Sequence, residues 1–431
     1  MRSTFVGVLL IGTFAGPLHA QSLRDKVVDL FRFGEGCSDP VCLSVGSAHG
    51  DHYNPAARTG QANLINFVSD AIGTSASNIP ISAASSGAVW GTSASGLPVR
   101  TETSAGPIFA ERAQTIGRGR MLIGANVSAF SFQSLRGVPL SDLQFNFTHQ
   151  EDAASGPLGT VPFQNDVIEV RSDVAVNLTA VTGFFTYGLL RRLDVSVAIP
   201  FVHTSLSGTS LAQVMPFTDP TPHFFGDPEN PQLRATAAAS GSASGIDDIA
   251  VRVKAGLGER GRMAFAALAD ARLPTGDEEN FLGAGKGSLR ALGIVSARYG
   301  DFSPHANFGY WIRSGEAQTD ALLFTAGFDQ LVGGRVTFAA DVISEWQVGD
   351  NPLQQPAPVL ITTPIGSEFR SDRLIEPSNI PDRRDNVVLA TLGFKISTAS
   401  GVTVVTNGIV PVRRGALQPD IAWTLGLEYS F

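Results

Sequence analysis

Alternating side chains dominate the sequence from Gly119 to the C-terminal end. The last segment shows the pattern most clearly, because one set of alternate residues is apolar and the other set is small or polar. The apolar set is Ile421, Trp423, Leu425, Leu427, Tyr429 and Phe431, and the second set is Asp420, Ala422, Thr424, Gly426, Glu428 and Ser430. Successive side chains of a β-strand point to opposite faces, so this pattern predicts a strand with one apolar face. The pattern recurs about a dozen times, which predicts an all-β fold.

The connections between these strands predict how the sheet closes. Strands are predicted near residues 119–133, 165–187, 192–207, 246–257, 261–274, 286–300, 303–316, 319–330, 334–348, 384–398, 401–413 and 418–431. Long connections mostly alternate with tight ones, although those near residues 317 and 414 are short where the alternation requires long ones. Short turns at one end and longer loops at the other are typical of bacterial outer-membrane barrels, whereas a soluble sandwich scatters long loops over both ends. We therefore predict a transmembrane antiparallel up-and-down β-barrel over residues 119–431, of about twelve strands, with fourteen as the alternative.

The composition agrees with a barrel that faces lipid. Charged residues make up 16% of the 431 residues, whereas soluble domains contain about 25%. Past residue 20, no apolar run approaches the roughly 18 residues that a membrane-spanning helix needs. Because hydrocarbon offers no hydrogen-bond partners, a sheet can cross a bilayer only when it closes on itself. The hydrophobic fraction of 43% also excludes a mainly disordered chain.

Residues 1–20 have the features of a cleaved signal peptide. Arg2 precedes an apolar stretch over residues 6–16, and Ala20 provides the small residue that signal peptidase requires. Cleavage would remove one of the 31 basic residues, which leaves 30 basic against 39 acidic residues and a formal net charge of −9. This acidity argues against a nucleic-acid partner. We predict export to the bacterial outer membrane, with membrane lipid as a partner, and the sequence leaves the oligomeric state open.

Residues 21–118 form an N-terminal segment unlike the rest of the chain. An amphipathic helix is predicted over residues 22–33, and residues 74–103 are rich in Ser, Ala and Gly. The segment cannot bury a sizeable core by itself, so it is either a plug inside the barrel lumen or a periplasmic tail. Cys37 and Cys42 predict a local disulfide in an exported chain. The alternative is a metal site that also uses His49 and His52, but this spacing matches no zinc-binding pattern, and we predict no metal and no cofactor.

One face of each barrel strand should carry the residues that line the lumen. The candidates are Glu169, Arg171, Asp173, Asp194, Arg252, Lys254, Asp270, Arg272, Arg290, Arg298, His305, Arg313, Asp341 and Glu345. A ring of one charge sign would predict an ion-selective pore, but these residues are mixed in sign. Most should therefore pair with one another across strands and stiffen the wall, and a minority should contact a solute.

Enzyme chemistry is not favoured by the sequence. The Ser- and Gly-rich stretches at residues 91–96 and 239–245 lack the flanking strand and helix of a nucleophile elbow. His203 lies near Ser205 and Ser207 at a predicted strand end, so a barrel hydrolase is a minor alternative. We predict that the protein is not an enzyme.

Several motifs resemble known barrel families. The terminal residues 426–431, with Tyr429 and Phe431, look like the signal that the barrel-assembly machinery recognises. Residues 187–195, 272–277 and 283–286 resemble the "transporter" barrels grouped with the meta-pathway of phenol degradation, and this resemblance covers roughly residues 165–431. Residues 53–57 are similar to an Asn-Pro-Ala element of long-chain fatty-acid transporter barrels, which admit hydrophobic solutes.

These resemblances imply a function. They imply an outer-membrane channel for the passive uptake of small, hydrophobic or aromatic solutes, with a small molecule and the assembly machinery as partners. A structural or adhesive barrel, whose loops at 208–245 and 349–383 bind partners, is the main alternative, and the hydrolase is the weaker one.

Overall fold

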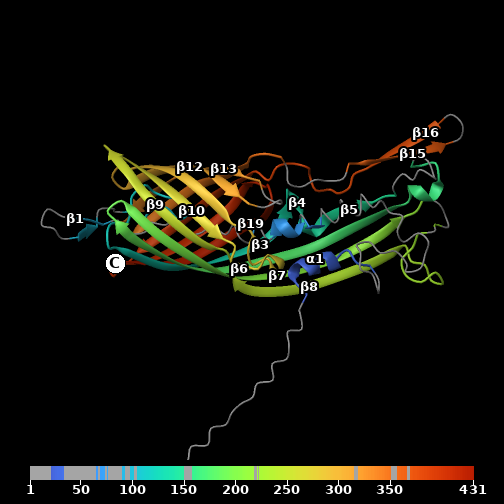
Figure 1. Ribbon diagram of the computed structural model, residues 1–431, viewed down its shortest axis with the longest axis horizontal. Coiled ribbons are helices and arrows are strands. Elements are labelled where there is room, and N and C mark those ends of the chain that lie inside the picture. The colour runs from blue at the N-terminus through green and yellow to red at the C-terminus, as the bar shows by residue number, and fades with distance from the viewer. Residues whose placement is uncertain are drawn as a thin grey trace, which may run out of the picture.

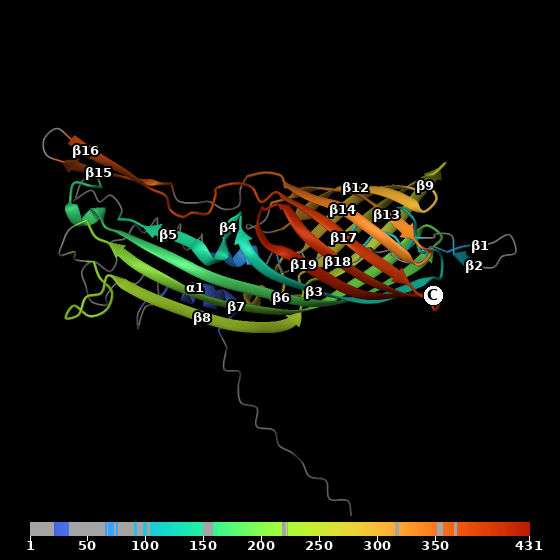
Figure 2. The same ribbon diagram turned by 180° about the vertical axis from the view of Figure 1, so that it is seen from behind.

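The computed structural model describes residues 21–33, 65–66, 68–72, 75, 90–92, 98–100, 104–149, 158–217, 221, 223–314, 319–350, 357–365 and 369–431. Twelve of its strands form a closed antiparallel barrel (Figures 1 and 2). They are β3 (Met121–Leu135), β6 (Val167–Leu190), β7 (Leu193–Met215), β9 (Ile249–Arg260), β10 (Met263–Leu273), β11 (Ser288–Ala297), β12 (Phe302–Arg313), β13 (Ala321–Val332), β14 (Val336–Gln347), β17 (Val387–Ser397), β18 (Val402–Arg413) and β19 (Leu417–Ser430). The ring closes because β3 pairs with β6 on one side and with β19 on the other. The predicted barrel is confirmed, and its strand number is twelve rather than fourteen.

Further strands lie where the sequence predicted only loops. Residues 134–164 contain β4 (Val138–Pro139) and β5 (Leu143–Phe147), and β5 pairs with β6. The connection predicted at 208–245 is wrong as a loop, because β7 continues to Met215 and β8 (Arg234–Ile246) pairs back along it. The connection at 349–383 likewise contains the hairpin of β15 (Val359–Ile365) and β16 (Phe369–Ile375). Small Ala, Ser and Gly side chains fill β8, so its two faces differ too little in hydropathy to show an alternation.

The remaining elements are short. Helix α1 (Leu23–Asp29) lies within the helix predicted over residues 22–33 but is shorter, and a capping box between Ser22 and Asp25 begins it. A small hairpin joins β1 (Trp90–Thr92) to β2 (Pro98–Arg100). The 3-10 turns are η1 (Leu140–Asp142), η2 (Pro162–Asn165) and η3 (Glu278–Asn280). No helix among the described residues is long and apolar enough to span a membrane.

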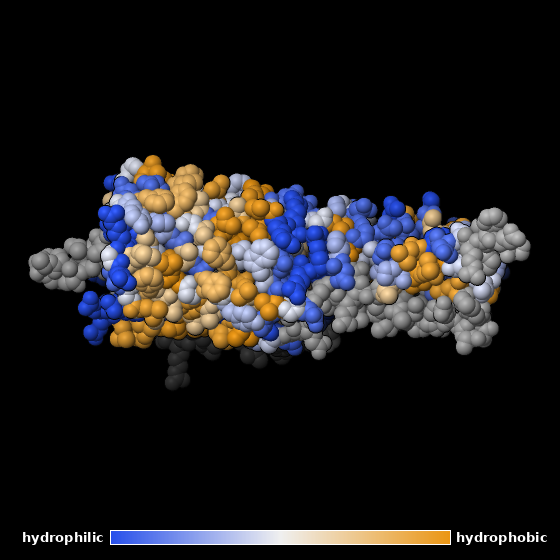
Figure 3. Space-filling view, turned by 90° about the horizontal axis from the view of Figure 1, so that it is seen from above, coloured by the Kyte–Doolittle hydropathy of each residue, from blue (hydrophilic) through white to orange (hydrophobic). Residues whose placement is uncertain are grey.

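The outside of the barrel presents apolar side chains to its surroundings. Leu392, Phe308 and Leu425 are about as exposed as surface residues of a soluble protein, at 59%, 61% and 60%. Figure 3 shows apolar side chains over much of the barrel. It also shows a strip of hydrophilic residues between the barrel and the part of the molecule that extends beyond it. An exposed apolar band of this kind is what a lipid-facing barrel requires.

The alternation changes phase part-way along β6 and β7, and this change marks the edge of the membrane. Val181 pairs with Phe201, and both side chains point outward. Two residues further from the short turn, Thr179 pairs with His203, and the outward face becomes polar. From Val202 onward the apolar residues Val202, Leu206, Ala212 and Val214 of β7 point inward and are buried, whereas Leu211 and Met215 point outward. The apolar face of these two strands thus contacts lipid on the short-turn side of the Thr179–His203 pair, and it contacts a protein core on the other side.

The strands that continue past this level form an outer extension, which we define as β5, β8, residues 167–179 of β6 and residues 203–215 of β7. It lies at the end of the barrel that carries the long connections (Figure 1). Long loops face the cell exterior in outer-membrane barrels. By this rule we expect the outer extension on the outside of the cell.

Helix α1 completes the core of the outer extension. Leu23, Val27 and Leu30 are buried against its inner face, and the ring of Phe31 packs edge-on against Phe145 at 5.0 Å. Glycines permit this close approach. A Cβ atom at Gly208 would lie 2.9 Å from Leu30 Cδ1, so a side chain there would push the helix away.

Shortening Leu30 should destabilise the outer extension. Leu30 has no exposed surface, so Leu30→Ala removes buried contacts and leaves a cavity, at a cost of about 2–5 kcal/mol. Urea titration of the refolded protein, followed by protease digestion of the outer extension, measures this loss. Leu233→Ala is the matched control because Leu233 is 40% exposed, and it should change stability by less than about 0.5 kcal/mol. Equal effects of the two substitutions would contradict the packing described for α1.

Candidate functional site: the barrel lumen

Most of the predicted lumen residues lie on the inward faces of their strands. These are Asp194, Arg252, Lys254, Asp270, Arg272, Arg290, His305, Arg313, Asp341 and Glu345, all buried or half-buried. Arg298 follows β11 at the short-turn end and is half-buried, and its backbone amide donates to the carbonyl of Arg262.

Glu169, Arg171 and Asp173 were assigned to the wrong face. They share the outward face of β6, opposite the buried Val170 and Ser172, and the Arg171 side chain is 58% exposed. This part of β6 belongs to the outer extension, where the apolar face turns inward to the protein core. Alternation identifies the apolar face of a strand but does not say whether that face meets lipid or protein.

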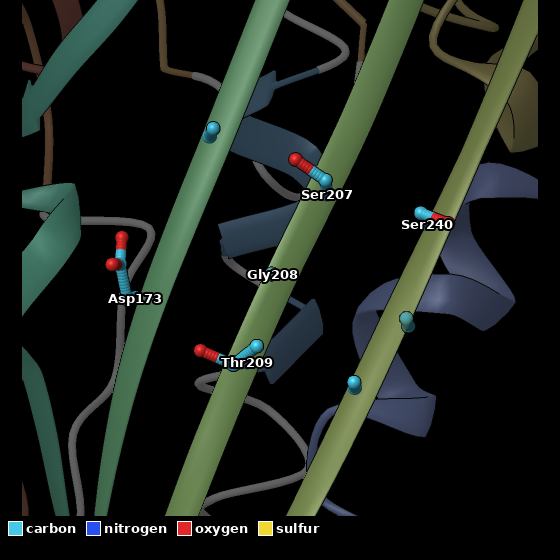
Figure 4. Close-up of a pocket in the computed structure, with 8 residues that line it drawn as sticks. Asp173, Ser207, Gly208, Thr209 and Ser240 are labelled. Atoms are coloured by element: carbon cyan, nitrogen blue, oxygen red, sulfur yellow. The ribbon is translucent and has the colours of Figure 1, made fainter.

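Asp173 instead borders a shallow outward depression. Figure 4 shows Asp173, Ser207, Thr209 and Ser240 on three neighbouring strands, with α1 behind β8. The depression has a volume of about 420 Å³ and is wide open to solvent. Its lining consists of small side chains and a single carboxylate, which offer a ligand little contact area.

Inside the barrel, charged side chains pair across strands, as the mixed signs predicted. Arg252 Nε lies 3.2 Å from Asp270 Oδ2, and the Arg313 guanidinium contacts the Glu345 carboxylate. Lys395 Nζ lies 3.3 Å from Glu428 Oε1, and both side chains are buried. The paired charges leave the wall without a ring of one sign.

A segment before the first barrel strand lies against this inner wall. We call residues 104–116 the inner strap. Backbone amides of the strap donate to side chains of four different strands: Ala105 to Thr337 Oγ1 at 2.9 Å, Glu111 to Asn307 Oδ1 at 2.8 Å, Ala113 to Ser296 Oγ at 3.1 Å, and Ile116 to Asp194 Oδ2 at 2.9 Å. These contacts could not be predicted from the sequence, because backbone amides carry no side-chain signature.

Glu111 connects the inner strap electrostatically to the wall. Its carboxylate lies 3.3 Å from Lys254 Nζ and 3.9 Å from the Arg252 guanidinium. Lys254 Nζ also donates to the carbonyl of Arg112 at 3.1 Å. Because Lys254 is fully buried, the strap carboxylate compensates a charge that would otherwise be costly inside the barrel.

A cavity of about 190 Å³ lies between the inner strap and strands β9–β14 and β17. Its apolar lining comprises Phe109, Leu268, Leu292, Trp311, Leu323, Ile343 and Leu389, and its polar lining comprises Glu111, Arg252, Asp270, Arg290, Asn307, Thr325, Ser344 and Glu345. The Trp311 ring is fixed by two guanidinium groups, with Arg290 Cζ 3.6 Å and Arg313 Cζ 3.9 Å from the ring centre. Cation–π contacts of this kind hold an aromatic ring in place. An apolar cavity of about 150 Å³ is large enough for benzene, so this cavity has room for a small aromatic molecule.

His203 does not assemble a hydrolase site in the part of the chain that the structure describes. Its Nδ1 atom lies 2.7 Å from Ser244 Oγ on the outward surface. A hydrolytic triad needs a serine on one ring nitrogen and an orienting carboxylate on the other, and no carboxylate is bonded to His203 among the described residues. The hydrolase alternative gains no support from this geometry.

Several sequence predictions fall outside the described residues. These are the disulfide of Cys37 and Cys42, the alternative ligands His49 and His52, and the Asn-Pro-Ala element at residues 53–57. Among the residues that are described, no group of three His, Cys, Asp or Glu side chains is placed to hold a metal ion.

Part of the chain matches a known protein family. Residues 158–350 match the family described as "Putative MetA-pathway of phenol degradation". The predicted family resemblance is confirmed. The match to the phenol-degradation family includes all three predicted motifs, at residues 187–195, 272–277 and 283–286, and most of the wall around the cavity. The inner strap and strands β17–β19 lie outside the matched residues.

Several solved outer-membrane proteins match the chain at low sequence identity. An outer-membrane channel from Pseudomonas putida F1 is 9% identical, with 74% of this chain and 98% of that chain covered and a TM-score of 0.41. A FadL homologue from Pseudomonas aeruginosa is 9% identical, with coverages of 74% and 90% and a TM-score of 0.32. The CymD monoaromatic hydrocarbon channel is 8% identical, with coverages of 73% and 89% and a TM-score of 0.31. No curated protein matches the sequence.

Proposed function

We propose that this protein is a passive outer-membrane channel for small hydrophobic or aromatic solutes. The observation that carries the proposal is the cavity beside the inner strap, where aliphatic side chains and two aromatic rings face a space of about 190 Å³. Apolar walls with a few polar groups are typical of small-molecule sites. The ion pairs in the wall favour an uncharged solute over an ion, because the charges already have partners.

The location is part of the same proposal. Residues 1–20 would be removed as a signal peptide during export. The barrel would then insert into the outer membrane with the help of the barrel-assembly machinery, which would recognise Tyr429 and Phe431 at the closing edge. In support of this role, the backbone of Phe431 pairs with Met121 across the seam between β19 and β3.

We further infer that residues 21–118 plug the lumen rather than form a periplasmic tail. Helix α1 packs in the outer extension, and Ser75 Oγ donates to the Leu417 carbonyl at the same long-loop end. Gly119 bonds to Gly188 at the opposite, short-turn end. Between these ends, the inner strap lies against the inner wall of the barrel. A solute would have to pass this segment.

Filling the cavity should slow the proposed transport. Leu323→Trp places a large ring in the solute path, and a barrier to passage higher by about 1.4 kcal/mol lowers solute flux roughly tenfold. Uptake of labelled toluene into proteoliposomes with lipopolysaccharide in the outer leaflet measures this flux, with glucose as a polar comparison. Leu322→Trp is the matched control, because Leu322 points outward from the same strand.

The outcomes separate the alternatives. The proposal predicts toluene uptake well above that of protein-free vesicles, reduced in Leu323→Trp and unchanged in Leu322→Trp. Absence of uptake with the wild-type protein would favour the structural or adhesive barrel. Uptake that both substitutions leave unchanged would place the solute path elsewhere.

A further inference from the structure

Two buried histidines meet at the far end of the outer extension. His149 follows β5, and His223 lies in the connection between β7 and β8. Their Nε2 atoms lie 3.1 Å apart, and their ring centres lie 4.7 Å apart with the planes inclined at 55°. His149 is 3% exposed and His223 is 1% exposed. Neither residue contacts the lumen cavity described above.

Asp166 fixes the orientation of His223. One carboxylate oxygen, Oδ2, lies 2.8 Å from His223 Nδ1. The Thr221 hydroxyl and the Phe217 amide also donate to this carboxylate, at 2.5 and 2.6 Å. Nδ1 of His223 therefore faces the Asp166 carboxylate, and Nε2 of His223 faces Nε2 of His149.

We propose that His149 and His223 form a binding site for a divalent transition-metal ion such as Zn²⁺. Imidazole nitrogens suit Zn²⁺, Ni²⁺ and Cu²⁺. Two nitrogens bound to zinc at about 2.0–2.1 Å with tetrahedral geometry are roughly 3.3 Å apart, close to the spacing of the two Nε2 atoms. A ligand histidine usually donates its other ring nitrogen to a carboxylate, and Asp166 occupies that position behind His223. Among the described residues no group of three His, Cys, Asp or Glu side chains is placed to hold a metal ion, so the two histidines leave the remaining coordination positions open to water.

A direct hydrogen bond between the two rings is the competing explanation of the same spacing. In that arrangement a proton sits between the Nε2 atoms, and no metal binds. An experiment can distinguish the two explanations, because only the metal site predicts that the full-length protein binds a metal ion through both rings.

Metal binding would join three segments that are far apart in sequence. The ion would tie the end of β5 to the connection before β8, and Asp166 would link both to the start of β6. A ligand that binds the folded protein alone raises its stability. The site would therefore stiffen the tip of the outer extension, independently of whether the barrel conducts a solute.

The test is calorimetric titration of Zn²⁺ into the metal-free, full-length mature protein in detergent. The proposal predicts binding that His149→Gln and His223→Gln each abolish, with a dissociation constant on the order of 1–100 μM, weaker than for closed four-ligand sites. Asp166→Asn should weaken binding by about 10–100-fold because it releases His223. His203→Gln, at an outward histidine, and the double variant His49→Gln/His52→Gln are the matched controls and should bind as the wild type does.

Two further measurements distinguish a loss of metal binding from a loss of folding in the variants. Cu²⁺ bound to the wild-type protein should show electron paramagnetic resonance couplings from two imidazole nitrogens. Heat-modifiable migration on gels reports whether each variant has folded. Three results would each overturn the proposal. They are metal binding that survives in both folded His149→Gln and His223→Gln, metal binding lost only in the His49/His52 variant, and no metal binding to the wild type.

Discussion

Deleting residues 21–110 from the mature chain should raise single-channel conductance in planar bilayers about tenfold or more, because conductance follows the free cross-section of the lumen. The deleted residues include residues 104–110 of the inner strap and their hydrogen bond from Ala105 to Thr337 of β14, whereas Glu111 keeps its contacts with Asn307 and Lys254. Equal, steady conductance of the full-length and shortened proteins would contradict the inferred plug. It would indicate an open pore with a dispensable N-terminal segment.

The deletion also removes α1 from the core of the outer extension, so it changes two features at once. A variant with fewer changes tests the plug alone. The triple substitution Ser296→Ala, Asn307→Ala and Thr337→Ala removes three side-chain acceptors of the inner strap and leaves α1 in place. We expect brief openings of this variant that the wild type lacks. Alanine substitution of the outward Thr406, an exposed hydroxyl of β18, is the control and should leave the recordings unchanged.

Glu428→Ala should destabilise the barrel by about 3–5 kcal/mol, because it leaves the buried ammonium of Lys395 without its partner. The two groups lie 3.3 Å apart and are both buried. Reversible urea unfolding of the barrel in lipid vesicles measures the loss. The double variant Lys395→Met/Glu428→Leu should recover most of it, since paired apolar residues replace a desolvated ion pair at little cost.

An exposed ion pair provides the comparison. Arg414 and Asp420 lie 2.6 Å apart, with side chains 41% and 60% exposed. Asp420→Ala should change stability by no more than about 1 kcal/mol, because solvent screens such a pair. If Glu428→Ala lowers the free energy of unfolding as little as Asp420→Ala does, the buried pair is overturned, because water must then reach Lys395.

The barrel itself could be predicted from sequence because lipid imposes one rule on every strand. From β9 to β14 most outward side chains are apolar, so the charged residues Arg252, Asp270 and Arg290 were expected to point inward, and they do. The rule fails in β6, where Glu169, Arg171 and Asp173 lie past the lipid. The sequence holds a signal of this change, because the apolar residues shift from even positions up to Leu178 to odd positions from Val181.

Other parts of the structure leave weaker traces in the sequence. Strand β8 alternates only between small residues, so hydropathy could not reveal it. The inner strap binds through backbone amides, which every residue except proline possesses. The pairing of His149 with His223 depends on long-range folding of two connections, and no local spacing could have brought them together.

The phase change in β6 also sets the height of the protein. Residues 167–179 continue past the lipid level, and at about 3.3 Å per residue they extend roughly 43 Å along the strand. With a strand tilt of about 40°, this length rises roughly 30 Å above the hydrocarbon. A solute approaching from outside therefore meets the outer extension long before it reaches lipid, at a distance where a sugar coat rather than the bilayer forms the surroundings.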